Sequence, residues 1–155
     1  MFIPLIFICV LLNYTSAQGV TSKTYKVEEY FKANWFQAYL FCRDHGMQLA
    51  TVTTSADQEI FSQIQLAPSN EYAVYENYWV SATDLAQDGT YKWFSNGQPL
   101  SHNAAWKSGQ PPELYVSVYE PKIDNVEDCV QVDAADLRWS STNCSTLNYF
   151  ICETV

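Results

Sequence analysis

The chain has 155 residues, of which 17 are acidic and 8 are basic, and its formal net charge is −9. With 48% hydrophobic residues it has the composition of one globular domain, which excludes a disordered or collagen-like chain. A chain this acidic, without a basic run, is repelled by phosphate backbones and anionic lipids, so we expect neither nucleic acid nor an anionic membrane as a partner.

The first residues have the pattern of a secretory signal peptide. Phe2–Leu12 is an almost unbroken apolar run that is too short for a membrane span, which needs about 20 residues. Small residues at 15–17 then fit a cleavage site. An N-terminal core strand is the alternative, but Pro4 would interrupt it. We expect a signal peptide over residues 1–17, a mature domain over 18–155, an extracellular location and no membrane anchor.

Residues 25–30 alternate as a half-buried strand does, and a helix is predicted after them. The helix is capped by Asn34 and stopped by Gly46, because glycine adopts the left-handed conformation at low cost. Its buried face is predicted from four residues at helical spacing, namely Trp35, Ala38, Tyr39 and Cys42.

A second helix is predicted close behind the first. Ser55 and Gln58 have the spacing of a capping box, which predicts a start near Thr54-Ser55. Pro68 ends any continuation. An apolar stripe supports this helix at Ile60, Phe61 and Ile64.

Short strands and one long loop are predicted for the rest of the chain. A turn at Asp88-Gly89 is expected to join the first two of these strands in a hairpin. Residues 95–127 contain four prolines and show no period, and a loop of this length is usually functional. The resulting fold class is α+β. The β-favouring runs lie at residues 78–82, 91–94, 129–132, 137–139 and 149–152.

Removal of the leader leaves Cys42, Cys129, Cys144 and Cys152. An even set of cysteines in a secreted chain indicates two disulfides, for which three pairings are possible. The set contains no CxxC pair, so neither a zinc site nor redox catalysis is indicated.

Seven sequence features occur in one order along the mature chain. They are Trp35-Phe36-x-Ala38 with Phe41-Cys42, Gly46-Met47-x-Leu49-Ala50, Tyr78-Trp79-Val80-Ser81, Trp106-x-x-Gly109-x-Pro111, Glu127-Asp128-Cys129, Trp139 before Cys144, and Tyr149-Phe150-Ile151-Cys152-Glu153. Together they resemble the short form of the C-type lectin-like domain, of the secreted single-domain type found in invertebrates. The resemblance implies Cys42–Cys152 and Cys129–Cys144 disulfides and a double-loop fold whose ligand-facing loop is residues 95–127.

The resemblance also implies a sugar site organised by calcium, which takes six to eight oxygen ligands. Its positions correspond to Gln110-Pro111, Glu127, Ser140 and Ser141 in this chain, and the Gln-Pro step favours galactose-type sugars in the family. Ser140-Ser141 stand where the family has Asn-Asp, and Pro112 stands where it has Asn or Asp. Neutral hydroxyls and a proline lower the charge of the site and therefore its calcium affinity.

Glu120-Pro121 is a second candidate for the same loop position, because its spacing to Glu127 is shorter. It lacks the Trp-x-x-Gly lead-in of Gln110, and Lys122 would place a cation where a cation ligand is needed. We favour Gln110-Pro111, which makes residues 113–126 an insertion in the loop.

An auxiliary calcium site of the family is better matched than the sugar site. Five carboxylates on one loop repel one another unless a cation neutralises them. The alternative is that Asp84 and Asp88 belong to a solvated turn. The five are Asp84, Asp88, Glu113, Glu127 and Asp128.

These features predict a secreted glycan-binding lectin that recognises sugars or microbial surfaces with calcium, as in innate immunity. The alternative is a C-type lectin-like module that binds a protein partner without calcium-dependent sugar binding. His45 and His102 belong to no recognised nucleophile motif, so no enzymatic activity is expected.

Overall fold

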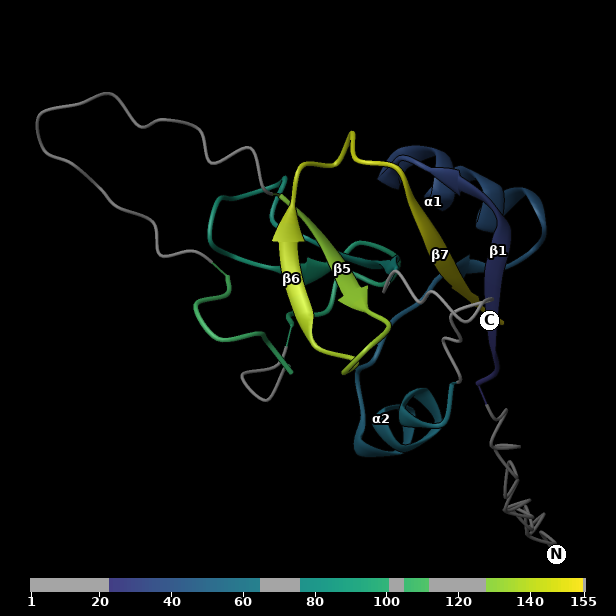
Figure 1. The fold of residues 1–155 in the computed structure, drawn as a ribbon, viewed down its shortest axis with the longest axis horizontal. Coiled ribbons are helices and arrows are strands. Elements are labelled where there is room, and N and C mark those ends of the chain that lie inside the picture. Colours follow the sequence, from purple (N-terminus) through teal and green to yellow (C-terminus); the bar gives the residue numbers. More distant parts are fainter. Residues whose placement is uncertain (1–22, 65–75, 101–104, 112–127, 155) are drawn as a thin grey trace, which may run out of the picture.

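The computed structural model describes residues 23–64, 76–100, 105–111 and 128–154, and the predicted signal peptide lies outside them (Figure 1). In these segments the α+β class is confirmed, with two helices and seven strands. The helices are α1 (Trp35–Asp44) and α2 (Ser55–Ser62). The strands are β1 (Tyr25–Ala33), β2 (Gln48–Leu49), β3 (Asn77–Thr83), β4 (Lys92–Trp93), β5 (Cys129–Asp133), β6 (Trp139–Thr142) and β7 (Asn148–Glu153).

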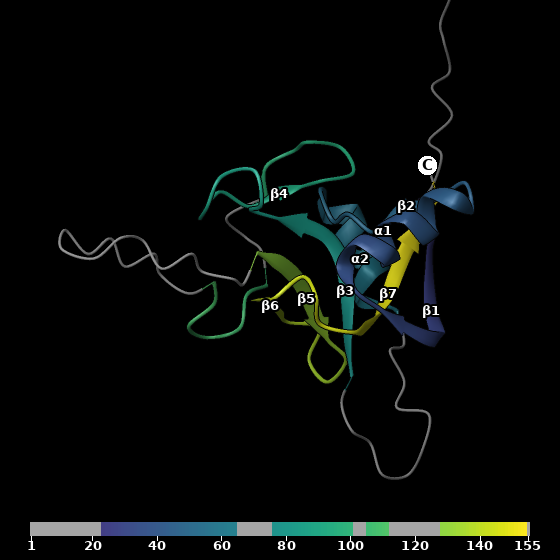
Figure 2. The ribbon, with the colours of Figure 1, turned by 90° about the horizontal axis from the view of Figure 1, so that it is seen from above.

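The strands form one sheet in the order β1-β7-β3-β5-β6, so β1 and β6 are its opposite edges (Figure 1). β1 runs antiparallel to β7, with Tyr25 opposite Glu153, and β3 runs parallel to β7. β2 pairs with β7, and β4 pairs with the C-terminal end of β3, which is the predicted hairpin (Figure 2). The sheet therefore joins segments from both ends of the described domain and leaves β6 as the edge beside residues 105–111.

The first helix begins and ends as predicted. Asn34 caps α1 in a capping box with Gln37, and Gly46 follows the helix with a φ of +70°. The second helix is capped one residue earlier than predicted, because Thr54 and Asp57 form the box instead of Ser55 and Gln58. The last predicted strand segment before Cys144 also shifts, since Leu137 has a φ of 55° and β6 begins only at Trp139.

The core is built from aromatic and aliphatic side chains, and two of its buried indoles donate to backbone carbonyls. The indole nitrogen of Trp35 donates to the Val80 carbonyl, and that of Trp79 donates to the Ala33 carbonyl, each at 2.9 Å. Both indole rings are fully buried. These bonds connect α1 and β1 to the central strand β3.

The disulfides confirm the pairing implied by the resemblance. Cys42–Cys152 connects α1 to β7, with 5.6 Å between Cα atoms, and Cys129–Cys144 connects β5 to the segment after β6, with 5.1 Å. The first bridge closes a loop of 110 residues, and such a loop is worth about 4 to 5 kcal/mol on the chain-entropy model.

A buried ionic network connects the N-terminal segment to both α2 and β7. Lys23 Nζ lies 3.1 Å from a carboxylate oxygen of Asp57 and 3.1 Å from one of Glu153, which is only 1% exposed. Thr51 donates to Glu153 through its backbone N–H at 2.9 Å and its hydroxyl at 2.8 Å. Each buried carboxylate is thus paired with a charge and with hydrogen-bond donors, which burial requires.

No helix among the described segments is long and apolar enough to cross a membrane.

The network predicts acid sensitivity. Burial raises the pKa of Asp57, but hydrogen bonds from Thr53 and the charge of Lys23 outweigh it and leave this pKa below its ordinary value. A depressed pKa gives stability that is complete above the unfolded value of about 4 and is lost as the pH falls through the folded value. Asp57→Asn should therefore lower the free energy of unfolding at pH 7 by about 1 to 3 kcal/mol and flatten its fall below about pH 4.

Urea unfolding between pH 7 and pH 2 measures both effects. Glu59→Gln, an exposed change on the same helix, is the control and should keep the wild-type profile. An Asp57→Asn protein with wild-type stability and the same acid profile would contradict the role given to this carboxylate.

Candidate functional site

Residues 105–111, the second described part of the long loop, add to the sheet edge at β6. The Trp139 N–H donates to the Ala105 carbonyl and the Lys107 N–H donates to the Trp139 carbonyl, both at 2.8 Å. Trp106 stacks edge-to-face on Trp139 and on Tyr91, with ring centroids 6.3 Å and 5.2 Å apart. This arrangement holds the loop against the sheet by backbone bonds and aromatic packing.

A tight turn presents Gln110 and Pro111 at the end of this segment. The Gln110 N–H donates to the Lys107 carbonyl at 3.0 Å, and Gly109 has a φ of +77°, where a side chain would be strained. The Gln110-Pro111 peptide bond is cis. Lys107 is fixed in turn by an ion pair with the carboxylate of Asp133 on β5.

The structure brings together two residues that the sequence placed in one ligand set. Ser141 donates to Gln110 Oε1 from its backbone N–H at 3.0 Å and from its hydroxyl at 3.1 Å, although 31 residues separate them. Ser141 is 5% exposed, whereas Gln110 and Pro111 are half-buried. Gln110 therefore reaches β6 as predicted, but it meets hydrogen-bond donors there.

The neighbouring hydroxyl is also engaged with the protein. Ser140 Oγ accepts a hydrogen bond from the Gln131 amide nitrogen at 3.2 Å. The Gln131 amide oxygen in turn accepts from Asn148 on β7 at 2.7 Å. Ser140 is therefore part of a polar chain that connects β6, β5 and β7.

The predicted acidic turn is present, and Asp84 has a structural role in it. Asp84 is 6% exposed, and its Oδ2 accepts from the Gly89 N–H at 2.7 Å. Its own N–H donates to the Asp128 carbonyl at 3.1 Å, which joins the turn to the segment before β5. Asp84 is thus not part of a solvated turn, whereas Asp88 lies half-buried in the same turn.

Tyr91 connects the acidic turn to Ser141, a link that the sequence did not reveal. Burial raises the pKa of the Tyr91 hydroxyl to about 12. A hydrogen bond with Ser141 lowers this pKa, while the charges of Asp84 and Asp128 and a hydrogen bond to Asp84 raise it. The hydroxyl therefore stays protonated at neutral pH and lies between the two predicted ligand sets.

The described donors of the sugar-site calcium centre that the resemblance implies are bonded to protein groups. Gln110 Oε1 accepts two hydrogen bonds, and the replaced ligands Ser140 and Ser141 are neutral hydroxyls bonded to protein groups. Within the segments that the structure describes, no group of three or more His, Cys, Asp or Glu could hold a metal ion. The remaining predicted residues Glu113 and Glu127, and the alternative Glu120-Pro121, lie outside those segments, so the auxiliary calcium site stays a prediction.

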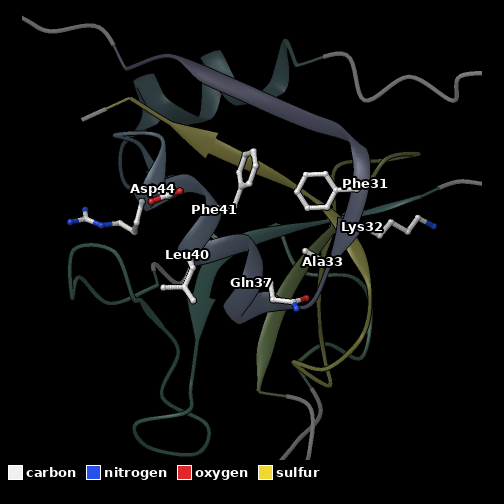
Figure 3. Close-up of a pocket in the computed structure, with 8 residues that line it drawn as sticks. Phe31, Lys32, Ala33, Gln37, Leu40, Phe41 and Asp44 are labelled. Carbon is white, nitrogen blue, oxygen red and sulfur yellow. The ribbon is translucent and has the colours of Figure 1, made fainter.

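A surface groove lies between β1 and α1, near the sheet edge opposite to β6 (Figure 3). Its apolar lining includes Phe31, Leu40 and Phe41, and its polar rim includes Arg43 and Asp44. None of the predicted ligand residues lines it, so the groove is separate from the candidate site.

Comparisons with known proteins identify the family of this chain. The family model described as "Lectin C-type domain" matches residues 31–154. "C-type lectin domain family 4 member M" of Hylobates lar is 33% identical over 122 residues, which cover 77% of this chain and 26% of that protein, so the chain spans about a quarter of that relative. "C-type lectin 16" of Aedes aegypti is 24% identical over 152 residues, which cover 94% of this chain and 92% of that one.

A solved structure has a similar fold. The mouse scavenger receptor C-type lectin carbohydrate-recognition domain superposes with a TM-score of 0.64 at 28% identity, over 86% of this chain and 90% of that chain.

The ion pair at the base of the loop gives a second prediction. Burial raises the pKa of Asp133, but hydrogen bonds from Lys107 and the Ala135 N–H and the charge of Lys107 outweigh it and lower this pKa. Lys107→Met should raise the Asp133 pKa towards its ordinary value of about 4, and it should cost at most about 1 kcal/mol of stability because the pair is partly exposed.

An NMR pH titration of the Asp133 carboxyl carbon measures this shift. Lys92→Met, which removes an exposed lysine on β4, is the control and should leave the Asp133 titration unchanged. An unchanged Asp133 pKa in Lys107→Met would mean that Lys107 does not anchor the loop.

Proposed function

Because this chain belongs to the C-type lectin domain family, we propose that it is a secreted glycan-binding protein and not an enzyme. The observation that carries the proposal is the contact between Gln110 and Ser141, which joins the loop motif to β6 at the place where the family resemblance puts the sugar site. A solved relative at 28% identity is a carbohydrate-recognition domain. The leader-like residues 1–17 support secretion.

The chemistry of the loop suits sugar hydroxyls. The amide nitrogen of Gln110 can donate to a sugar oxygen, and the Ser140 hydroxyl can both donate and accept. Trp106 and Tyr91 are half-buried beside these groups, and an aromatic ring offers an apolar face to a sugar ring. Pro111 follows Gln110 and is half-buried. We propose glycans with galactose-type sugars, including those on microbial surfaces, as the ligands.

The proposal includes a calcium ion bound by the auxiliary set of carboxylates. Carboxylates are the hard oxygen ligands that calcium prefers. Asp84 and Asp128 are adjacent through a backbone hydrogen bond of 3.1 Å, which supports their use in one site. The five residues proposed for the ion are Asp84, Asp88, Glu113, Glu127 and Asp128, and isothermal calcium titration of the protein against Asp84→Asn tests this assignment.

A protein-binding module is the second candidate function. It is favoured by the neutral ligand set, because Ser140 and Ser141 replace charged calcium ligands and the oxygen of Gln110 is taken up by Ser141. Such a module would bind a protein partner without calcium-dependent sugar binding.

Binding of the mature protein to a panel of immobilised glycans tests the proposal. We expect galactose-type glycans to be bound, and we expect Gln110→Ala to weaken that binding at least tenfold, because it removes the amide that faces the ligand. Gln58→Ala, an exposed change on α2, is the matched control and should bind like the wild type.

The panel is measured once with millimolar calcium and once with EDTA. Binding by the wild type that Gln110→Ala does not weaken would move the sugar site away from this loop. Wild-type protein that binds no glycan in either buffer would overturn the proposal in favour of a protein ligand.

A further inference from the structure

A direct contact connects the loop to β6 at the predicted sugar site. The Ser141 N–H and the Ser141 hydroxyl both donate to Gln110 Oε1. Ser141 is 5% exposed, so little water competes for this contact.

We infer that Ser141 takes the place of a calcium ion as the group that positions Gln110, so that the loop at residues 105–111 keeps its ligand-facing position without metal. The inference concerns the glycan site proposed above and rests on that proposal for its biological role. It assigns Ser141 as a positioning residue, since Ser141 acts on the ligand surface through Gln110.

The geometry at Gln110 Oε1 carries the argument. An amide oxygen has two lone pairs, and it faces two donors here, the N–H of Ser141 at 3.0 Å and the hydroxyl of Ser141 at 3.1 Å. Both lone pairs are therefore used, and the two hydrogens present positive partial charge where a cation would have to bind. In this arrangement Gln110 cannot also serve as a calcium ligand.

The residue type at position 141 makes this replacement possible. The resemblance places Asp at this position, and an ionised carboxylate accepts hydrogen bonds but donates none. A carboxylate would repel the Gln110 oxygen unless a cation lay between them. Serine supplies a donor instead, and this converts a cation-bridged pair of acceptors into a direct donor–acceptor pair.

Two further contacts hold the same segment without metal. Lys107 pairs with the Asp133 carboxylate, and the segment exchanges backbone hydrogen bonds of 2.8 Å with Trp139 on β6. The loop is therefore fixed at its base by an ion pair, along its length by β-type pairing, and at its tip by Ser141.

Hydrogen exchange of single amides, followed by NMR on the full mature protein with millimolar calcium and with EDTA, tests the inference. The Ser141 N–H reports on the bond directly, because its acceptor is Gln110 Oε1. The wild-type Ser141 amide should exchange at the same rate in both buffers, within about twofold. Gln110→Met, which keeps the side-chain length but removes the acceptor, should speed this exchange about tenfold in both buffers.

Conservative variants separate positioning from a general loss of structure. Gln110→Glu keeps an acceptor and should restore slow exchange, and Ser141→Thr should keep the hydroxyl bond that Ser141→Ala loses. Ser140→Ala, the adjacent change on β6, is the control and should leave the Ser141 amide unchanged. Amides of β3 and β7 report in each variant whether the fold is intact.

EDTA that speeds wild-type Ser141 exchange as much as Gln110→Met does would overturn the inference, because an ion would then hold the loop. A Gln110→Met protein with wild-type exchange, or a Gln110→Glu protein as fast as Gln110→Met, would overturn it as well. Exchange is measured without glycan, so a protein that keeps the Ser141 bond but binds no sugar refutes only the proposed function.

Discussion

The fold depends on the burial of one C-terminal strand between segments from the start and the middle of the chain. β7 pairs with β1 on one side and with β3 and β2 on the other, and its Cys152 is bonded to α1. Glu153, the last residue of β7, is almost completely buried and is compensated by Lys23 and Thr51. Because β7 is formed by the last described residues, the sheet is complete only when nearly the whole domain is present.

The regular parts of the fold could be predicted from local sequence patterns. The helical spacing from Trp35 to Cys42 and the stop at Gly46 predicted α1, and the turn at Asp88-Gly89 predicted the β3–β4 hairpin. The sequence pattern predicts the cap of α2 one residue too late, because Thr54/Asp57 and Ser55/Gln58 both satisfy the capping pattern. The choice between them follows the contact of Asp57 with Lys23, which lies 34 residues away and is contained in no local pattern.

The candidate site was only partly predictable for a related reason. The resemblance grouped Gln110 with Ser141, and the structure places them in contact. Ser141 donates to Gln110 because its hydroxyl proton and its backbone N–H both point at the amide oxygen. The sequence does not give these directions, so the contact could not be predicted from it. Asp84 was grouped as a metal ligand, yet its carboxylate also holds the Gly89 N–H inside its own turn. Tyr91, which links these residues, has no sequence motif of its own.

The pairing of β1 with β7 determines where the first and last described residues lie. Lys23 and Thr154 lie at neighbouring positions on one edge region of the sheet, since Thr154 N–H donates to the Thr24 carbonyl and Tyr25 lies opposite Glu153. The loop at residues 105–111 joins the opposite edge, at β6 (Figure 1). The first and last described residues therefore lie side by side, and they are separated from the loop at residues 105–111 by the width of the sheet.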